Sequence, residues 1–331
     1  MRYYRPIPMM DAARPEGARQ LAGGWCWFDR VEVLERGQAP RVVPLSEVPD
    51  DQITAMVAPR PDIAALTMST PQIMGILNVT PDSFSDGGKF DTASAALAQG
   101  RAMMADGATI IDIGGESTRP GAAEVEMNEE AARIAPSVEA LAPHAVVSID
   151  TRKTLVAQKA ADLGAAILND VSAMEFDPDM VNVAAKTGLP ICLMHSQGTP
   201  ETMQKDPSYT DVLLDIYDYL EARIQVAEAA GIPRSRIITD PGIGFGKTQA
   251  HNLALLRRIS LFHTLGCPIL LGASRKRFIG EISGAQDAAQ RVAGSVSVAL
   301  DGIRHGVQIV RVHDTLPTKQ ALSLMMAINE E

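Results

Sequence analysis

Long apolar runs are missing from this sequence of 331 residues, and none reaches the length of a membrane span. The opening MRYYRPIPMM carries arginine and proline where a secretion signal has an apolar stretch. Cysteine is also scarce: Cys26, Cys192 and Cys267 are odd in number and lack CxxC spacing, so we interpret them as buried thiols in a reducing compartment. These absences predict a cytoplasmic protein with no membrane partner.

Positive charge is in the minority, because 30 Lys and Arg face 40 Asp and Glu, for a net charge of -10. A nucleic-acid backbone or an anionic membrane would be repelled overall, which argues against both as partners. The hydrophobic content of 46% and charged content of 21% suit one large soluble domain or two small ones.

Lysine is absent from residues 1–70, which contain both tryptophans and many prolines. An alternating apolar piece from Trp27 to Leu34 is typical of a strand. We therefore expect residues 1–70 to form an N-terminal extension of unknown role, either a small β-rich appendage packed on the main domain or an irregular lead-in. Residues 71–331 are expected to form the main domain.

From Ile73 onward, short apolar runs alternate with amphipathic helical stretches. The runs span residues 73–78, 109–113, 146–150, 166–169, 190–195, 237–240, 268–272 and 308–313, and helical stretches include 92–105, 151–163, 211–230 and 288–304. Strand and helix alternating eight times predict a parallel (β/α)₈ TIM barrel, and the alternative is a doubly wound open sheet.

Polar side chains stand at the ends of these runs. They are Asn78, Asp112, Asp150, Asn169 with Asp170, His195, Asp240, and Arg311 with His313, while the run ending at Gly272 leads to Ser274, Arg275 and Lys276. All strand ends of a barrel meet at one face, so we expect these side chains to surround a single pocket. Capping of the following helix is the alternative for some of them, especially Asp170.

Two of these strand ends carry further signals. The first run breaks at Asn78 into a loop rich in Ser, Asp and Gly, which is typical of an active-site loop, although a solvated turn has the same composition. Arg311 and His313 lie two residues apart, so both point to the same face and can bind an anion. An ion pair between Arg311 and an aspartate such as Asp314 is the alternative.

Some catalytic arrangements are absent. No Ser-His-Asp or Cys-His set has convincing spacing, and the histidines show no HxH or HExxH grouping. Nucleophilic catalysis and a metal-dependent hydrolase are both disfavoured.

The polar motifs, taken together, resemble those of dihydropteroate synthase. The similar segments, in family order from about residue 72 to 315, are MGILNVTPDSFSDGG, GATIIDIGGESTRPGA, VVSIDTRK, AILNDVSA, CLMHSQGTPETMQ, DPGIGFGKT, LLGASRKRFIG and VRVHD. The resemblance implies a pterin-binding barrel that condenses 6-hydroxymethyl-7,8-dihydropterin diphosphate with 4-aminobenzoate in folate biosynthesis. It also implies Mg²⁺, a homodimer and sensitivity of the aminobenzoate site to sulfonamides.

The resemblance also implies roles for individual residues. The pterin pocket is lined by Asp112, Asp150, Asn169, Asp240 and Lys276. From their residue types we expect Met194 and Phe245 to add apolar walls for a flat ring, with core packing as the commoner explanation for Met194. Diphosphate is bound by Asn78, Arg119, Arg311 and His313, with Mg²⁺ on Asn78, and aminobenzoate lies toward Phe84, Thr118, Pro120 and Ser274. The catalytic set is Asn78, Asp112, Asp150, Lys276, Arg311 and His313. Arg277 stands where some family members have serine.

The chemistry of a pterin fits these side chains. Its cyclic guanidine edge presents two adjacent N–H donors, which one carboxylate accepts together, and we assign that role to Asp240. Lys276 can donate to the carbonyl edge. Two alternatives stay open: a pterin-binding methyltransferase domain, which has no use for the diphosphate residues, and a non-catalytic pterin-binding paralogue, which is expected to lack some of them.

Overall fold

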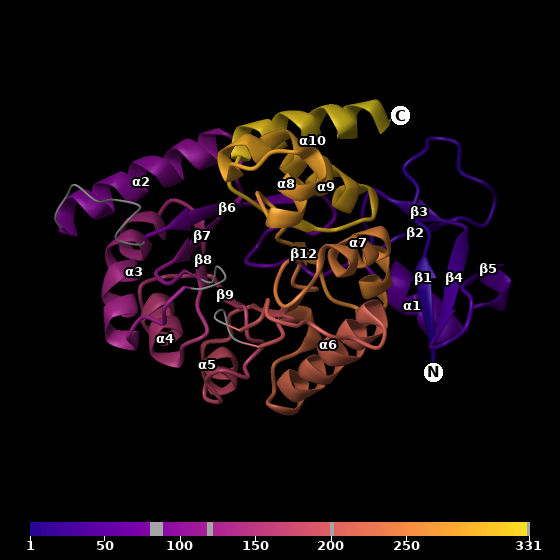
Figure 1. Ribbon diagram of the computed structural model, residues 1–331, viewed down its shortest axis with the longest axis horizontal. Helices are drawn as coiled ribbons and strands as arrows, with labels where there is room; N and C mark the ends of the chain where they lie inside the picture. The colour runs from indigo at the N-terminus through magenta and orange to yellow at the C-terminus, as the bar shows by residue number, and fades with distance from the viewer. Residues whose placement is uncertain (80–88, 118–121, 199–201, 330–331) are drawn as a thin grey trace.

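The apolar runs of the main domain form eight parallel strands. The computed structural model describes residues 1–79, 89–117, 122–198 and 202–329 (Figure 1). The strands are β6 (Gln72–Asn78), β7 (Ile110–Gly114), β8 (Val146–Asp150), β9 (Ile167–Asp170), β10 (Ile191–Met194), β11 (Ile237–Asp240), β12 (Leu270–Leu271) and β13 (Ile309–Val312). They lie in the order β11-β10-β9-β8-β7-β6-β13-β12, and a parallel bridge between Thr239 and Ile269 closes the ring.

Helices surround this ring (Figure 1). They are α2 (Lys89–Ala105), α3 (Met127–Leu141), α4 (Thr154–Asp162), α5 (Met180–Thr187), α6 (Val212–Ala229), α7 (Gln249–Arg257), α8 (Arg277–Ser283), α9 (Val292–Arg304) and α10 (Thr315–Asn329). Short 3₁₀ helices include η4 (Ile259–Leu265) and η5 (Ala288–Arg291). The closed ring confirms the (β/α)₈ barrel and excludes the open doubly wound sheet.

One strand is shorter than the sequence predicts. The run 268–272 contains regular strand only at Leu270–Leu271. The preceding backbone N–H of Ile269 donates to the side-chain oxygen of Gln308 at 2.9 Å rather than to a strand carbonyl. The regular pairing with β13 therefore starts at Leu270, one residue after Ile269.

The alternation of side chains divides the barrel into an inside and an outside. In β7, Ile111 and Ile113 face the surrounding helices, whereas Ile110 and Asp112 point inward. The part of the interior toward the amino-terminal ends of the strands is apolar. It is filled by Met74, Ile110, Ile167, Cys192, Ile238, Leu270 and Ile309. All three cysteines are buried and free, as the sequence predicts. The carboxyl ends of the strands are left to the polar residues.

The N-terminal extension is β-rich, as one of the two interpretations of the sequence predicted. Strands β1 (Arg2–Pro6), β4 (Arg30–Glu35) and β5 (Arg41–Pro44) form an antiparallel sheet, accompanied by the pair β2 (Arg19–Gln20) and β3 (Trp27–Phe28), η1 (Leu45–Glu47) and helix α1 (Asp50–Val57). The extension has a small core of its own around Phe28, Val31 and Met56. Figure 1 shows it as the indigo lobe beside helices from the second half of the barrel.

The extension contacts the barrel through polar and apolar side chains. The indole N–H of Trp25 donates to the carbonyl of Ile303 at 2.8 Å, and the buried guanidinium of Arg60 donates to the carbonyl of His263 at 2.6 Å. Both carbonyls lie at the carboxyl ends of helices, α9 and η4, where backbone acceptors lack intrahelical partners. Further along, Ile63 and Met68 are fully buried and belong to the apolar layer inside the barrel. The extension thus caps two helices and covers the amino-terminal end of the barrel.

A buried carboxylate also connects the two parts. Glu32 on β4 is bonded to Arg5 on β1 at 2.5 Å and to Arg258 of the barrel at 2.9 Å. Burial opposes the charged form, but the hydrogen bonds from the two arginines outweigh it and lower the pKa of Glu32.

We expect Glu32→Gln to lower the free energy of unfolding by about 2–3 kcal/mol, because two partly buried guanidinium groups lose their carboxylate. Since the pKa of Glu32 is lowered by folding, its contribution is present above the unfolded-state pKa and is lost as the pH falls through the folded-state value. The difference between wild type and variant in urea unfolding should therefore shrink on acidification. Glu47→Gln is the control, because the Glu47 side chain is 57% exposed; equal effects of both variants would contradict the prediction.

Candidate active site

A layer of charged and amide side chains fills the carboxyl-terminal end of the barrel. Arg311 on β13 donates from Nε to Asp112 on β7 at 2.6 Å and from a terminal nitrogen to Asp150 on β8 at 2.7 Å. Asn169 on β9 donates to the same oxygen of Asp112 at 3.2 Å. Residues up to 199 positions apart in the chain therefore meet at one place, as the strand ends predicted.

Two carboxylate oxygens of this layer have no hydrogen-bond partner among the described residues. They are Oδ1 of Asp112 and Oδ1 of Asp150, and both are buried. A buried acceptor without a donor costs free energy, so these atoms are suited to accept N–H groups from a ligand. Burial raises the pKa of Asp150 to about 7; Arg311 acts against this shift, and the Asp112 carboxyl adds to it.

Asp240, at the end of β11, lies in the same layer next to Met194. The two residues are partners in the parallel register of β10 and β11. Oδ1 of Asp240 accepts the backbone N–H of Gly242 at 2.7 Å. Gly242 has a φ of +69°, and a Cβ there would lie 1.9 Å from the carbonyl oxygen of His195, so only glycine fits this turn. Burial raises the pKa of Asp240.

Lys276 and Phe245 face each other beside this aspartate. The Lys276 ammonium lies 4.2 Å from the centre of the Phe245 ring and donates to the carbonyl of Ile243. Burial lowers the pKa of Lys276 to about 7, and the nearby Asp240 carboxylate only partly offsets it. A cation, a carboxylate and an aromatic face are thus combined, as a flat heterocycle with donors and acceptors on its edge requires.

Two further predicted anion residues, Asn78 and His313, lie at the end of β6 and directly after β13. Nδ1 of His313 is 3.0 Å from Oγ of Ser274, which also accepts the backbone N–H of His313 at 3.2 Å. A Cβ built on Gly114 would be 3.7 Å from Oδ1 of Asn78 and 3.8 Å from Oδ2 of Asp150, so both oxygens border the space above that glycine.

The contacts of Asp314 and Asp170 decide two alternatives that the sequence left open. Asp314 pairs with Arg275 at 2.5 and 3.0 Å, whereas the carboxylates that Arg311 contacts are those of Asp112 and Asp150. Asp170 accepts the backbone N–H groups of Ser172 at 2.8 Å and Met174 at 2.6 Å, so it caps the turn after β9 rather than lining the pocket.

The sequence can now be compared with known proteins. Residues 74–313 match the family model described as "Pterin binding enzyme". The dihydropteroate synthase of Escherichia coli K12 is 45% identical over 265 residues, which cover 80% of this chain and 93% of that protein. The dihydropteroate synthase of Neisseria meningitidis serogroup B is 47% identical over 267 residues, 79% of this chain and 94% of the relative.

Solved structures agree. Xanthomonas albilineans dihydropteroate synthase with 4-aminobenzoic acid is 43% identical, has a TM-score of 0.77, and covers 82% of this chain and 99% of its own. The same enzyme in complex with 7,8-dihydropteroate gives 40% identity and a TM-score of 0.74, with coverages of 82% and 100%. The chain belongs to the dihydropteroate synthase family. It is a transferase, and its N-terminal sheet and α1 precede the residues that match the family model.

Several residues attributed to the dihydropteroate synthase site by resemblance lie outside the described residues. These are Phe84, Thr118, Arg119 and Pro120. Their expected contacts with aminobenzoate and diphosphate stay predictions.

Two buried lysines, Lys247 and Lys153, were not among the residues predicted from the sequence. Lys247 is buried, with its ammonium 2.9 Å from Nδ1 of His195 and 2.8 Å from the carbonyl of Phe245. Burial, and then the Lys247 charge, lower the pKa of His195 to about 2, so this histidine is a neutral acceptor. Lys153 forms a second buried cluster with Glu116 and Glu130. The motifs GFGKT and IDTRK contain these lysines, but nothing in a single sequence distinguishes them from exposed ones.

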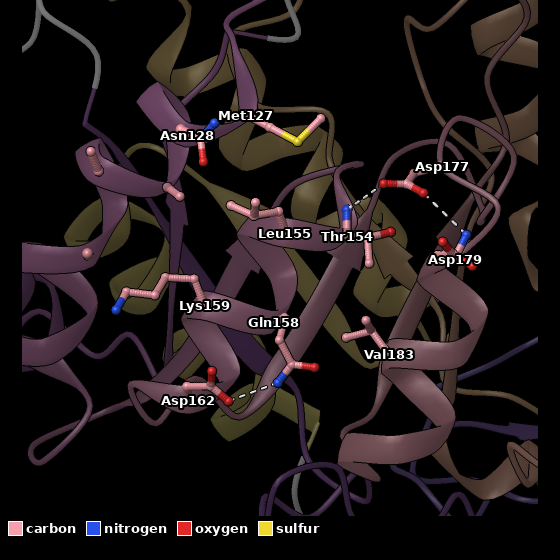
Figure 2. Close-up of a pocket in the computed structure, with 13 residues that line it drawn as sticks. Met127, Asn128, Thr154, Leu155, Gln158, Lys159, Asp162, Asp177, Asp179 and Val183 are labelled. Atoms are coloured by element: carbon pink, nitrogen blue, oxygen red, sulfur yellow. Dashed lines mark hydrogen bonds between the residues drawn. The ribbon is translucent and has the colours of Figure 1, made fainter.

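A surface groove lies elsewhere. A groove of about 790 Å³ runs over the outer faces of α3, α4 and α5 (Figure 2). Its walls include Met127, Leu155 and Val183, with Gln158 hydrogen-bonded to Asp162 at 2.8 Å. None of the residues that line it belongs to the polar layer at the strand ends. The polar layer at the barrel mouth, rather than this groove, is therefore the candidate active site. Within the described ranges, no helix is both long enough and apolar enough to span a bilayer.

Proposed function

We propose that the polar layer at the barrel mouth is the site where 4-aminobenzoate attacks 6-hydroxymethyl-7,8-dihydropterin diphosphate. The amine nitrogen forms a bond to the exocyclic methylene carbon of the pterin, the bond from that carbon to the diphosphate oxygen breaks, and the amine gives up a proton. The observation that carries the proposal is the convergence of four strand-end residues, Asp112, Asp150, Asn169 and Arg311, with two carboxylate oxygens left to accept a ligand's donors.

The pterin is held by complementary edges in this proposal. Asp240 accepts the two N–H donors of the cyclic guanidine edge, and Lys276 donates to the carbonyl edge. Asp112, Asp150 and Asn169 contact the remaining ring and amine groups. Met194 and Phe245 bound the flat ring.

Departure of diphosphate is the demanding step, because its charge grows as the bond breaks. Arg311 and His313, together with Arg119, are proposed to neutralise that charge. The negative charge of Asp112 and Asp150 stabilises the developing cation on the pterin methylene. We propose an ordered, dissociative displacement in which diphosphate binding completes the aminobenzoate site near Phe84, Thr118, Pro120 and Ser274.

The residues at this site suit Mg²⁺ held mainly by the substrate. Among the described residues, no group of three or more His, Cys, Asp and Glu side chains is arranged to hold a metal ion. Asn78 offers a single amide oxygen beside the Asp150 carboxylate, and Mg²⁺ commonly takes its other ligands from phosphate oxygens and water. When bound, it would supply further neutralisation of the diphosphate charge.

We propose that the protein works in the cytoplasm, within folate biosynthesis, as a homodimer. Its three buried free thiols suit a reducing compartment. Exposed apolar side chains on α8 and α10, among them Ile282 at 55%, Leu324 at 63% and Ile328 at 71%, support a subunit contact through barrel helices. Sulfonamides are proposed to compete with aminobenzoate, which the Yersinia pestis enzyme solved with a sulfonamide drug supports. Sedimentation of wild type and of Leu324→Glu tests the dimer.

Diphosphate release tests the function. Purified protein with the pterin diphosphate and Mg²⁺ should release diphosphate only when 4-aminobenzoate is present, in equal amount to the dihydropteroate formed. Pterin binding without turnover would instead indicate a non-catalytic paralogue. Tight binding of aminobenzoate in the absence of pterin and diphosphate would contradict the proposed order.

The pH dependence of kcat/KM tests Lys276. Since its pKa is about 7, the ammonium loses its charge above that pH, and kcat/KM for the pterin diphosphate should fall on the alkaline side of pH 7. In Lys276→Arg the guanidinium stays charged, so this alkaline limb should disappear whatever the absolute rate. The acid limb, to which Asp150 contributes with its pKa of about 7, should remain. An unchanged alkaline limb in Lys276→Arg would contradict this assignment.

A further inference from the structure

A buried ammonium group lies just outside the polar layer, between the loops that follow β7 and β8. The Lys153 side chain is 3% exposed, and its Nζ donates to Glu116, to the carbonyl of Val125, and to Glu130 at 2.7 Å. Three acceptors satisfy the three donors of an ammonium group. Thr151 donates to the other oxygen of Glu130 at 2.7 Å, so this glutamate is held from both sides.

The cluster joins the two ends of one loop. Glu116 lies two residues after β7, and Val125 lies two residues before α3. Besides binding Lys153, the Oε2 atom of Glu116 accepts the backbone N–H of Val125 at 3.0 Å. The Lys153 ammonium and one oxygen of Glu116 therefore hold Glu116 and Val125 together.

The start of this loop is fixed in a second way. The carbonyl of Gly115 accepts a hydrogen bond from Arg133 on α3 at 3.0 Å. A Cβ on Gly115 would lie 2.8 Å from Cγ2 of Ile134, so the backbone is pressed against that helix. The path of the chain out of β7 is set by α3 as well as by the strand.

Net stability is a weak explanation for such a cluster. Glu116 is 6% exposed and Glu130 1% exposed, and moving such charges out of water costs about as much as their attraction returns. Arg152 adds a second cation, bonded to Glu116 at 3.0 Å, so two carboxylates face two cations. Buried ion clusters of this kind define one geometry, because most displacements leave a charge unpaired.

We propose that Lys153, with Glu116 and Glu130, fixes the backbone at Glu116 and Val125, and that this geometry sets the affinity for the second substrate. Lys153 is three residues after Asp150 and Glu116 is four residues after Asp112, so the cluster connects the loop ends to the two carboxylates that Arg311 binds. The inference rests on the proposed function, in which residues between Glu116 and Val125 contact aminobenzoate and diphosphate. Lys153 touches neither substrate and is a positioning residue.

The test compares Lys153→Met with Lys159→Met, a control at an exposed position on α4, the helix that Lys153 precedes. We expect Lys153→Met to raise the KM for 4-aminobenzoate at least tenfold while the Kd of the pterin substrate changes less than threefold. The milder Glu116→Gln keeps the volume and an acceptor oxygen, and should shift the KM in the same direction. Thermal unfolding of each variant identifies those that fail to fold, in which case Glu116→Gln carries the comparison.

Hydrogen exchange separates this inference from the proposed function. Without substrate, the backbone N–H of Val125 should exchange at least tenfold faster in Lys153→Met than in Lys159→Met, because its acceptor Glu116 is no longer held. If exchange is faster in Lys153→Met but the wild type shows no turnover, the proposed function and the positioning role are both overturned, while the anchoring of Val125 by Lys153 and Glu116 stands. Unchanged exchange, or equal losses of affinity for both substrates, would overturn the anchoring itself.

Discussion

Replacing Arg311 by alanine is expected to lower kcat by about 10²–10³-fold, the usual loss when a charge-stabilising donor is removed from an active site. Arg311 contacts Asp112 and Asp150 at 2.6 and 2.7 Å across the barrel mouth, so its guanidinium pairs with both carboxylates. Its loss removes positive charge from the leaving-group side and leaves two buried carboxylates facing each other. Coupled diphosphate release and dihydropteroate formation are the measurements.

Two further variants make this prediction specific. Arg311→Lys keeps the charge but cannot reach both carboxylates from one planar group. We therefore expect its kcat to be at least about tenfold below that of wild type. Arg257→Ala, at an exposed position on α7, should leave kcat unchanged. If Arg311→Ala retained more than a fifth of wild-type kcat, the anion-binding role would be untenable.

Asp240→Asn is expected to weaken pterin binding by about 10²-fold or more. The amide keeps the shape and the acceptor for the Gly242 N–H, but it replaces a carboxylate oxygen by an NH₂ group that faces the pterin donors. Each charge-assisted hydrogen bond lost contributes about 1.5–3 kcal/mol, and two donors are affected. Calorimetric titration with the pterin measures the change directly.

The control for Asp240→Asn is an aspartate that binds its own backbone and has no proposed contact with the pterin. Asp170 is fully buried at the end of β9, two strands away from β11 in the sheet, but it binds backbone N–H groups of its own turn. Asp170→Asn should therefore lower stability with little effect on pterin affinity. Equal losses of pterin affinity in the two variants would mean that Asp240 acts through folding rather than through contact.

The barrel could be predicted because eight apolar runs alternate with helices, and the location of the site follows from that topology. Asp112, Asp150, Asn169 and Arg311 were expected to converge because they stand at strand ends, and they do. Which of them pair could not be predicted, because partners across a barrel are not related by any spacing in the chain. Arg311 thus binds two distant aspartates, while adjacent Asp314 binds Arg275.

Buried lysines were the main omission. Lys153 and Lys247 each satisfy their ammonium with acceptors from different loops, and this depends on packing that only the folded chain defines. Charged residues are exposed so often that a single sequence gives no reason to expect otherwise. The role of the N-terminal extension was equally out of reach, since its hydrogen-bond partners in the barrel lie between 179 and 278 residues away.

That separation has a consequence for how the chain acquires its structure during synthesis. Tyr3 binds Asp218 across 215 positions and Trp25 binds Ile303 across 278, so the extension is synthesised well before its partners in the barrel. Contacts of such high sequence separation form late and slowly. The extension therefore cannot guide early folding. Its contact with Ile303 belongs to the same class of long-range contacts as the pairing of β13 with β6.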